Sequence, residues 1–447
     1  MNIKRAKQEI KNTIQAYHLK DAKGEYRIPV IRQRPILLMG PPGVGKTQIM
    51  EQIAEECQLP LVSYTITHHT RQSAIGLPFI KEKEYQGNTY SVTEYTMSEI
   101  IASVYEKMEQ TGQQEGILFI DEINCVSETL APTMLQFLQC KSFGNQSVPK
   151  GWIIVAAGNP PEYNKSVREF DVVTLDRVKK IDVEADFQVW KEFAYEQKIH
   201  GAIISYLDIK KDCFYQIETT IDGKRFATAR GWQDLSEILQ VYEELDMLMD
   251  QEVIFQYIQH GRIAKDFANY LELYAKYRTD YQIDGILQGK WKPSAIEKLK
   301  FAPFDERLSV IGLLISRLGE IFSHVKEMDK QVSRTYEDLK EKKALEGRLD
   351  ESVREAFQKQ TELREQMLND AAENLECAFD FCEVAFGESQ EMVVFITELT
   401  VNQYSAWFIG ENGCDRYYKY NKGLLFHERQ QGILQDMDEV RSLMEGN

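Results

Sequence analysis

The fold of the N-terminal part of the chain is decided by Gly40-Pro41-Pro42-Gly43-Val44-Gly45-Lys46-Thr47, which follows the pattern G-x-x-x-x-G-K-[ST]. The stretch lies between an apolar run at residues 36–39 and a helical pattern that begins near Lys46. Glycines let the backbone turn its N–H groups inward, and a helix N-terminus adds positive potential at the same place. We therefore predict that all eight residues bind the phosphates of ATP. Lys46 would reach the β- and γ-phosphates, and Thr47 would give a hydroxyl ligand to Mg²⁺.

The surrounding sequence alternates between short apolar runs and helical patterns. Apolar runs at residues 36–39, 61–66, 117–120 and 153–157 read as buried strands, and helical patterns follow near residues 46, 97, 127 and 187. This alternation predicts an α/β fold with a parallel sheet flanked by helices. All twelve prolines lie at or before Pro303, so the last third of the chain is predicted to be mostly α-helical.

We expect three parts along the chain. These are an α/β nucleotide-binding domain at residues 1–197, a small helical lid at residues 198–250 and a helical C-terminal region at residues 251–447. Within the last part, residues 332–375 are rich in charge, with apolar positions at mixed spacings. Such a stretch fits either a long exposed helix or a helical hairpin that bends near Gly347.

Composition narrows the environment and the partners. The net charge of -17 and the pI near 5.1 give a surface that on average repels nucleic acid and anionic lipid. The seven cysteines are scattered and include no C-x-x-C pair, which favours a reducing cytoplasm over a disulfide framework. No apolar signal region opens the sequence, and no uninterrupted apolar segment approaches about 20 residues. We therefore expect a cytoplasmic protein without a membrane anchor.

Two further strand ends carry polar side chains suited to ATP hydrolysis. The run at residues 117–120 ends in Asp121 and Glu122, and the run at residues 153–157 leads through Gly158 to Asn159. Ligands of open parallel sheets bind at the edge formed by such strand ends. Asp121 is predicted to hold Mg²⁺ together with Thr47, and Glu122 to orient the attacking water or accept its proton. Asn159 would hydrogen-bond the water and the γ-phosphate; alternatively, it only starts a proline turn.

Two arginines complete the predicted catalytic set. Arg177 precedes a strand candidate at residues 180–183 and could project to the γ-phosphate of a neighbouring subunit as an arginine finger. Arg230 opens a helix at the start of the lid and could fold over the phosphates of its own subunit. A surface salt bridge and a helix-start contact are the simpler alternatives. Arg168 is a competing finger candidate.

Taken in order, these positions resemble the Walker A, Walker B, sensor 1, arginine finger and sensor 2 positions of AAA+ ATPases. Finer features resemble the MoxR branch, which is related to dynein and midasin: residues 121–124 (DEIN), 157–160 (AGNP), 175–177 (LDR) and 228–232 (TARGW). The resemblance covers residues 32–239. The chain departs from it after Arg177, where Val178 stands in place of a frequent phenylalanine.

The resemblance implies a homo-oligomeric ring, usually of six subunits, that binds ATP between neighbours and remodels a protein client. A partner with a von Willebrand factor A domain is also implied. Residues 67–96 are similar to the helix-2 insert, which faces the central pore in related rings, and Phe143 is a candidate substrate contact near that pore. An ordinary exposed hairpin and a packed aromatic are the alternatives. His68 and His69 are assigned to the insert rather than to a metal site.

Two other functions compete with protein remodelling. Related rings translocate DNA, so a nucleic-acid motor or a restriction-type NTPase is the main alternative. The acidic charge and the lack of a basic run interleaved with aromatics count against nucleic acid as a partner. A nucleotide-gated scaffold with little turnover is the third possibility, which the retained Glu122, Asn159 and Arg177 disfavour.

Overall fold

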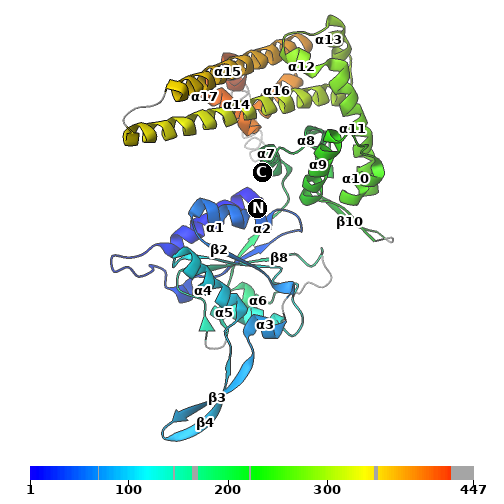
Figure 1. The fold of residues 1–447 in the computed structure, drawn as a ribbon. Helices are drawn as coiled ribbons and strands as arrows, with labels where there is room; N and C mark the ends of the chain where they lie inside the picture. The colour runs from blue at the N-terminus through cyan, green and yellow to red at the C-terminus, as the bar shows by residue number, and fades with distance from the viewer. Residues whose placement is uncertain (69, 144–145, 164–169, 221–222, 347–350, 424–447) are drawn as a thin grey trace, which may run out of the picture. The chain divides into compact units, whose positions relative to one another are not determined.

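The computed structural model describes residues 1–68, 70–143, 146–163, 170–220, 223–346 and 351–423 (Figure 1). It divides into two compact units. We call the first the sheet unit, which comprises Met1–Val189 and Thr228–Gly231. The second, the helical unit, comprises Trp190–Ala227 and Trp232–Asn447. Arg168 and His69 lie outside the described residues, so the structure gives no account of either.

The sheet unit is built on five parallel strands in the order β2-β5-β8-β1-β9. Their bounds are Leu61–Thr65, Gly116–Asp121, Trp152–Gly158, Ile36–Met39 and Lys179–Asp182 respectively. The predicted α/β fold with a parallel sheet is confirmed. Because β5 lies beside β8 and β8 beside β1, the strand ends that carry the predicted chemistry meet at one edge of the sheet.

Helices cover both faces of this sheet (Figure 1). Alternate residues of β1 point to opposite faces: Ile36 and Leu38 join one core, and Leu37 and Met39 join the other. The first core is shared with α1 (Ile3–His18) and α2 (Lys46–Cys57). The second is shared with α4 (Glu99–Thr111) and α5 (Ala131–Cys140). Burial on both faces explains why these strands read as unbroken apolar runs.

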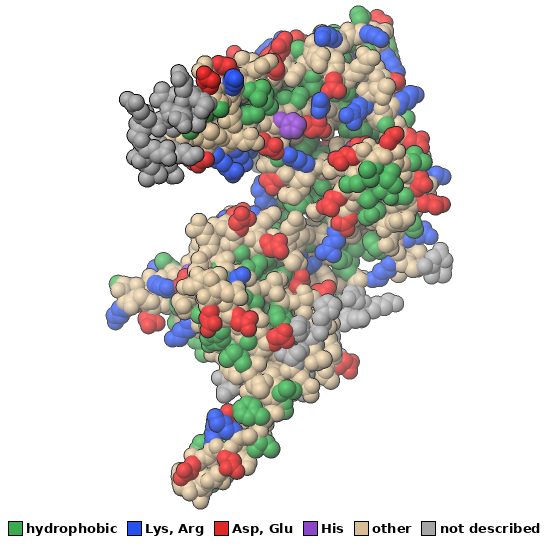
Figure 2. Space-filling view, in the orientation of Figure 1, with side chains coloured by type: hydrophobic (Ala, Val, Ile, Leu, Met, Phe, Trp, Pro, Cys, Tyr) green, Lys and Arg blue, Asp and Glu red, His purple; other side chains and the backbone are tan. Residues whose placement is uncertain are grey.

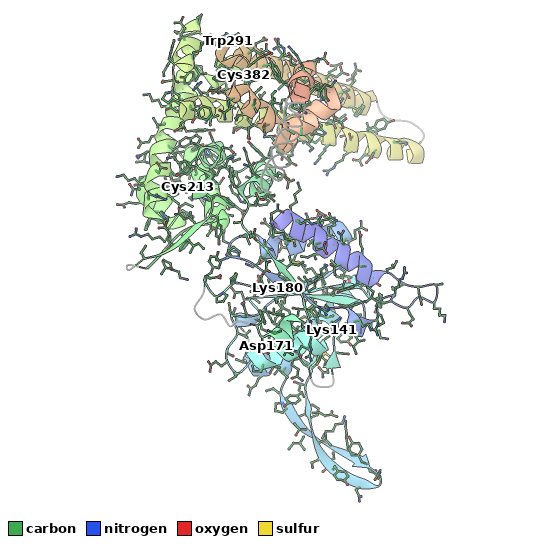
Figure 3. All side chains as sticks on the ribbon, turned by 180° about the vertical axis from the view of Figure 1, so that it is seen from behind. Lys141, Asp171, Lys180, Cys213, Trp291 and Cys382 are labelled. Carbon is green, nitrogen blue, oxygen red and sulfur yellow. The ribbon has the colours of Figure 1, made fainter. Side chains whose placement is uncertain are left out.

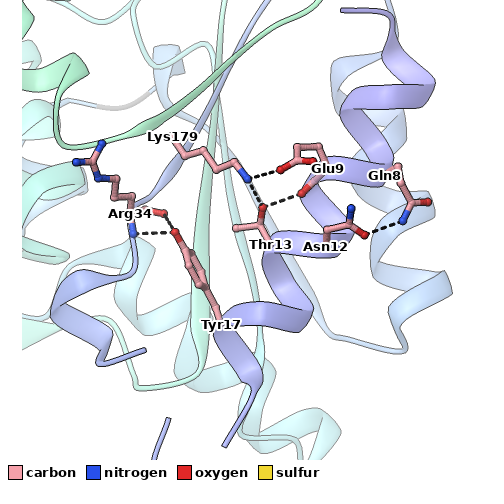
Figure 4. Close-up of polar contacts among 7 residues, drawn as sticks. All are labelled: Gln8, Glu9, Asn12, Thr13, Tyr17, Arg34 and Lys179. Atoms are coloured by element: carbon pink, nitrogen blue, oxygen red, sulfur yellow. Dashed lines mark hydrogen bonds and ion pairs between the residues drawn. The ribbon is translucent and has the colours of Figure 1, made fainter. Parts of the chain in front are cut away.

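Polar contacts anchor α1 to the edge of the sheet (Figure 4). The Lys179 ammonium on β9 donates to Glu9 Oε1 at 2.6 Å and to Thr13 Oγ1 at 2.7 Å. The hydrogen bond and charge of Lys179 hold the pKa of the Glu9 carboxyl below its usual value. Farther along the helix, Tyr17 Oη accepts from the Arg34 N–H at 3.0 Å, directly before β1. The helix therefore fixes both β9 and the start of β1, the strand that leads into the predicted phosphate-binding loop.

A two-stranded hairpin extends from the sheet unit between α3 (Arg71–Ile75) and α4 (Figure 1). The short helix η2 (Ile66–His68) precedes α3. Strands β3 (Pro78–Tyr85) and β4 (Asn88–Tyr95) pair across Gln86 and Gly87, whose φ values of 52° and 83° are those of a two-residue type I′ turn. Hydrophobic and charged side chains share its surface (Figure 2). Exposed examples are Phe79, Ile80, Tyr85, Tyr90 and Tyr95.

A second, short hairpin corrects the expectation for Phe143. It follows α5 and consists of β6 (Ser142–Phe143) and β7 (Gln146–Ser147). Phe143 is 4% exposed, and its ring stacks on Phe137 with the centroids 4.2 Å apart. The suggested substrate contact is wrong for this side chain, because its apolar surface is already buried in the core of the sheet unit.

The sheet unit ends with α6 (Val172–Leu175) and β9, after which α7 (Phe187–Glu196) continues into the helical unit. The early part of the helical unit contains α8 (Gly201–Ile209), η3 (Lys211–Cys213), β10 (Gln216–Thr220), β11 (Gly223–Ala227) and α9 (Ala229–Glu244), the first residues of which belong to the sheet unit. The antiparallel pair β10–β11 was not predicted. Its alternating Ile217, Thr219 and Phe226 favour a strand over a helix.

Where the structure describes it, the rest of the helical unit is built from α-helices. It contains α10 (Gln251–Tyr257), α11 (Gly261–Tyr281), α12 (Ile283–Leu287), α13 (Pro293–Lys300), α14 (Phe304–Glu346), α15 (Glu351–Phe386), α16 (Gln390–Val401) and α17 (Gln403–Asn412). The two long helices α14 and α15 lie side by side, and α16 and α17 pack against α14 (Figure 1). The helices α11, α12, α13, α14, α15, α16 and α17 all contribute buried side chains to one apolar core.

Part of the long helix α14 is strongly apolar. By length and composition its part Phe304–Lys340 is able to cross a membrane, with an 18-residue window of mean hydropathy 1.4. In the structure 61% of that window is buried, and Leu314, Leu318 and Phe322 lie in the core of the helical unit. A core helix of a folded domain has this composition as well.

Candidate active site

The loop between β1 and α2 has the backbone that its glycines predict. Gly43 and Gly45 have φ values of 75° and 87°, in the left-handed region that favours glycine. Gly45 is the N-cap of α2, so the helix begins at Lys46 with its N-terminus at the loop. This is the arrangement in which N–H groups and the helix dipole attract a phosphate.

Lys46 lies at the centre of the candidate site and is only 8% exposed. Its ammonium donates to the carbonyl oxygens of Gly40 and Pro41, both at 2.8 Å, and to Asn159 Oδ1 at 2.9 Å. The pKa of Lys46 is lowered to about 8, mainly by burial; the charge of Asp121 acts in the opposite direction, and the charge of Arg230 adds to the lowering. The loop thus holds a desolvated cation that an anionic ligand would stabilise.

The predicted magnesium ligands contact each other. Thr47 Oγ1 donates to Asp121 Oδ2 at 2.6 Å, which joins the first turn of α2 to the end of β5. Next along the chain, Glu122 has a φ of 57°, which is uncommon for a residue other than glycine, and its N–H donates to Asp121 Oδ1 at 2.9 Å. Backbone strain of this kind is frequent where a catalytic side chain must be presented at a fixed angle.

Two residues without an assigned role also contact this group. Thr67 Oγ1 donates to Glu122 Oε2 at 3.0 Å. Asn124 hydrogen-bonds the backbone of Asn159 on the neighbouring strand β8. Thr67 belongs to no motif that would predict this contact, whereas Asn124 is the last residue of the sequence DEIN at residues 121–124.

Arg230 approaches the loop although it is distant in sequence. The segment Thr228–Gly231 belongs to the sheet unit, and a Cβ added at Gly43 would lie 3.3 Å from Thr228 Cβ and 3.5 Å from Arg230 Cβ. Any residue larger than glycine at position 43 would therefore press on this segment. The guanidinium is exposed, and its charge influences Lys46.

Arg177 stands apart from this cluster. It follows α6, whose N-cap is Asp171, labelled in Figure 3. The Asp171 side chain accepts from the Thr174 N–H at 2.7 Å. The Arg177 side chain is exposed and donates to Gln139 at the end of α5. The next residue, Val178, is 3% exposed in the core, so a small apolar side chain fits where a phenylalanine was expected. Within its own chain, Arg177 is not part of the group around Lys46.

Comparison with known proteins supports this interpretation of the sheet unit. Residues 36–175 match the family model AAA, the ATPase family associated with various cellular activities. The matched segment, which we call the AAA domain, is similar to the ATPase domains of this family. It contains the loop, Asp121, Glu122 and Asn159, whereas Arg177 and Arg230 lie beyond it. No curated protein matches the chain.

The residues of the AAA domain fit the nucleotide and the metal ion that the family implies. The buried Lys46 ammonium donates to three neutral oxygens, which is a setting in which phosphate is a better partner. The Thr47 hydroxyl and the Asp121 carboxylate offer adjacent oxygens, the ligand type that Mg²⁺ prefers. Among the described residues, no cluster of three or more His, Cys, Asp or Glu side chains forms another candidate metal site.

Proposed function

We propose that this chain is an Mg²⁺-dependent ATPase of the MoxR-like branch of AAA+ proteins, which assembles into a ring and remodels a protein partner in the cytoplasm. The observation that carries the hydrolytic part is a pair of hydrogen bonds in the AAA domain. Lys46 contacts Asn159, and Thr47 contacts Asp121, at the edge where three strands end. The residues for phosphate binding, metal binding and water activation thus converge on one edge.

The geometry gives each side chain a task in hydrolysis. Lys46 would move from the loop carbonyls to the β- and γ-phosphates, and Asn159 would hold the γ-phosphate and the attacking water. Glu122 would accept the proton as the water oxygen bonds to the γ-phosphorus and the bond to the β,γ-bridging oxygen breaks, leaving ADP and phosphate. Mg²⁺, held through Thr47 and Asp121, would neutralise charge on the phosphates.

Arg177 is proposed to act on the ATP of a neighbouring subunit. Its guanidinium is exposed and lies outside the cluster of its own chain. The adjacent α6 exposes two apolar side chains, Val172 at 81% and Val173 at 55%. Exposed valines next to an exposed arginine fit a surface that a second subunit covers. This supports a homo-oligomer, and the resemblance to MoxR proteins suggests six subunits.

A protein client agrees better than nucleic acid with the charge of the chain. The net charge of -17 opposes a phosphate backbone. The hairpin β3–β4 presents exposed Ile80, Tyr85 and Tyr90, which suit contacts with another polypeptide. We infer a protein client or a partner with a von Willebrand factor A domain. The alternative is a nucleic-acid motor or a restriction-type NTPase.

One experiment compares these functions directly. Glu122→Gln is expected to bind ATP without hydrolysing it, so sedimentation and affinity capture from nuclease-treated extract with ATP should yield a ring that retains protein. Lys46→Ala is the matched control, which should neither assemble nor retain the partner with ATP. Absence of ATP-dependent assembly would contradict the ring. Salt-sensitive stimulation of wild-type turnover by DNA would favour the nucleic-acid motor instead.

A further inference from the structure

Asn124 uses both ends of its side-chain amide to hold the backbone of one residue. Its Nδ2 donates to the Asn159 carbonyl oxygen at 2.8 Å, and its Oδ1 accepts from the Asn159 N–H at 3.2 Å. Asn124 is 3% exposed. A buried amide that satisfies both groups of one peptide position fixes that position more tightly than a single hydrogen bond would.

The turn after β5 brings Asn124 to this place. Beyond the end of the strand, the Ile123 N–H donates to the Ala157 carbonyl oxygen at 2.9 Å, which extends the contact between β5 and β8. Glu122, the residue before Ile123, has a left-handed backbone that redirects the chain. The Cys125 N–H donates to the Glu122 carbonyl oxygen at 2.9 Å, which closes the turn. Glu122 and Asn159, which come from different strands, are thereby connected through one short turn.

Gly158 permits the approach of Asn124. A Cβ added at Gly158 would lie 2.6 Å from Asn124 Oδ1, closer than real Cβ atoms come to a neighbour, and 3.0 Å from Asn124 Cγ. Gly158 has no positive φ, so its glycine is required by space rather than by backbone conformation. An alanine there would push Asn124 away from Asn159.

We propose that Asn124 is a positioning residue for ATP hydrolysis, which acts by fixing the turn that carries Asn159. The Asn159 side chain accepts from Lys46 at 2.9 Å, so the orientation of this turn decides where its amide meets the phosphate site. Both hydrogen bonds of the Asn124 side chain go to the backbone of Asn159. The inference rests on the proposed ATPase function and concerns the alignment of its catalytic groups.

A double-mutant cycle separates positioning from general stability. Asn124→Ala should lower kcat by roughly tenfold or more while ATP affinity changes less than about threefold. Asn159→Ala should lower kcat as well, and the double variant should be no slower than Asn159→Ala alone, because Asn124 acts through Asn159. Multiplicative losses, or an unchanged kcat in a folded Asn124→Ala, would overturn the proposal.

Two further variants complete the test: one displaces Asn124 indirectly, and the other controls for loss of stability. Gly158→Ala should reproduce the effect of Asn124→Ala and add nothing to it. Asn2→Ala removes an N-cap of the same unit, where Asn2 Oδ1 accepts from the Arg5 N–H at 3.0 Å. It should lower the melting temperature and leave kcat unchanged. Equal kcat losses in Asn2→Ala and Asn124→Ala would mean that destabilisation alone explains both.

Hydrogen exchange provides a test that does not need turnover. In Asn124→Ala the peptide that contains the Asn159 N–H should exchange faster than in the wild type, and in Asn2→Ala it should not. Unchanged exchange at this peptide in Asn124→Ala would refute the positioning role, whether or not the protein hydrolyses ATP. A wild-type protein without ATPase activity, but with the expected exchange, would instead refute the proposed function alone.

Discussion

Thr67 donates a hydrogen bond to Glu122, with 3.0 Å between Oγ1 and Oε2. Thr67 lies in η2, from which the chain continues through α3 into the hairpin β3–β4. One oxygen of the predicted general base is therefore occupied by a neighbour rather than by water. The contact also joins the segment that leads towards the hairpin to the predicted catalytic carboxylate.

We expect Thr67→Val to raise basal ATP turnover by a factor of about 2 to 10, the equivalent of one hydrogen bond that no longer competes with water for Glu122. Valine keeps the shape of threonine and removes the donor. Steady-state hydrolysis checks this, with Thr93→Val on the exposed strand β4 as the matched control. An unchanged or lower rate in Thr67→Val alone would show that this hydrogen bond does not restrain Glu122.

ATP affinity should depend on pH through Lys46. Burial lowers the pKa of the free ammonium to about 8, and bound phosphates must raise it, because opposite charge favours the protonated form. Binding is then strongest below pH 8 and weakens as the pH rises through that value, by up to about tenfold per pH unit.

Titration of ATP binding from pH 7 to pH 9.5 measures this dependence. Lys46→Arg provides the control, since its guanidinium stays protonated throughout and should flatten the profile. Lys46→Ala should not bind ATP at any of these pH values. A flat profile for the wild type would exclude Lys46 as the titrating partner of the phosphates.

Mixed rings test whether Arg177 acts across a subunit interface. Arg177→Ala and Glu122→Gln should each be inactive alone, because each ring lacks one catalytic group at every site. When the two are mixed, some interfaces combine an intact Glu122 with an intact Arg177 from the neighbour, so part of the activity should return. Hydrolysis measured against mixing ratio checks this, and mixed rings that stay inactive would argue for another residue as the finger.

Much of the sheet unit could be predicted from the sequence because its strands are buried on both faces. Ile36–Met39 and Trp152–Gly158 are apolar throughout, so each reads as a strand without help from its neighbours. The pair β10–β11 was missed because its strands are short, partly polar and set between helices. Their pairing is a tertiary contact that local patterns do not reveal.

The part of the candidate site that could be predicted consists of residues that lie in recognisable motifs at the ends of strands. Lys46, Thr47, Asp121 and Asn159 meet as expected, because parallel strands end at the same edge. The contacts of Thr67 with Glu122 and of Asn124 with Asn159 were not predictable, since they depend on β2 lying beside β5 and β5 beside β8. Strand order is set by the packing of the whole sheet and leaves no mark in a single segment.

The most direct test of the account is ATP binding and hydrolysis by Glu122→Gln, measured side by side with the wild type. The substitution keeps the size of the side chain and one oxygen that accepts hydrogen bonds, and it removes the ability to accept a proton. We predict ATP affinity within about threefold of the wild type and a turnover at least about 100-fold lower. Turnover close to that of the wild type, with binding intact, would contradict the assignment of this edge of the sheet as the hydrolytic site.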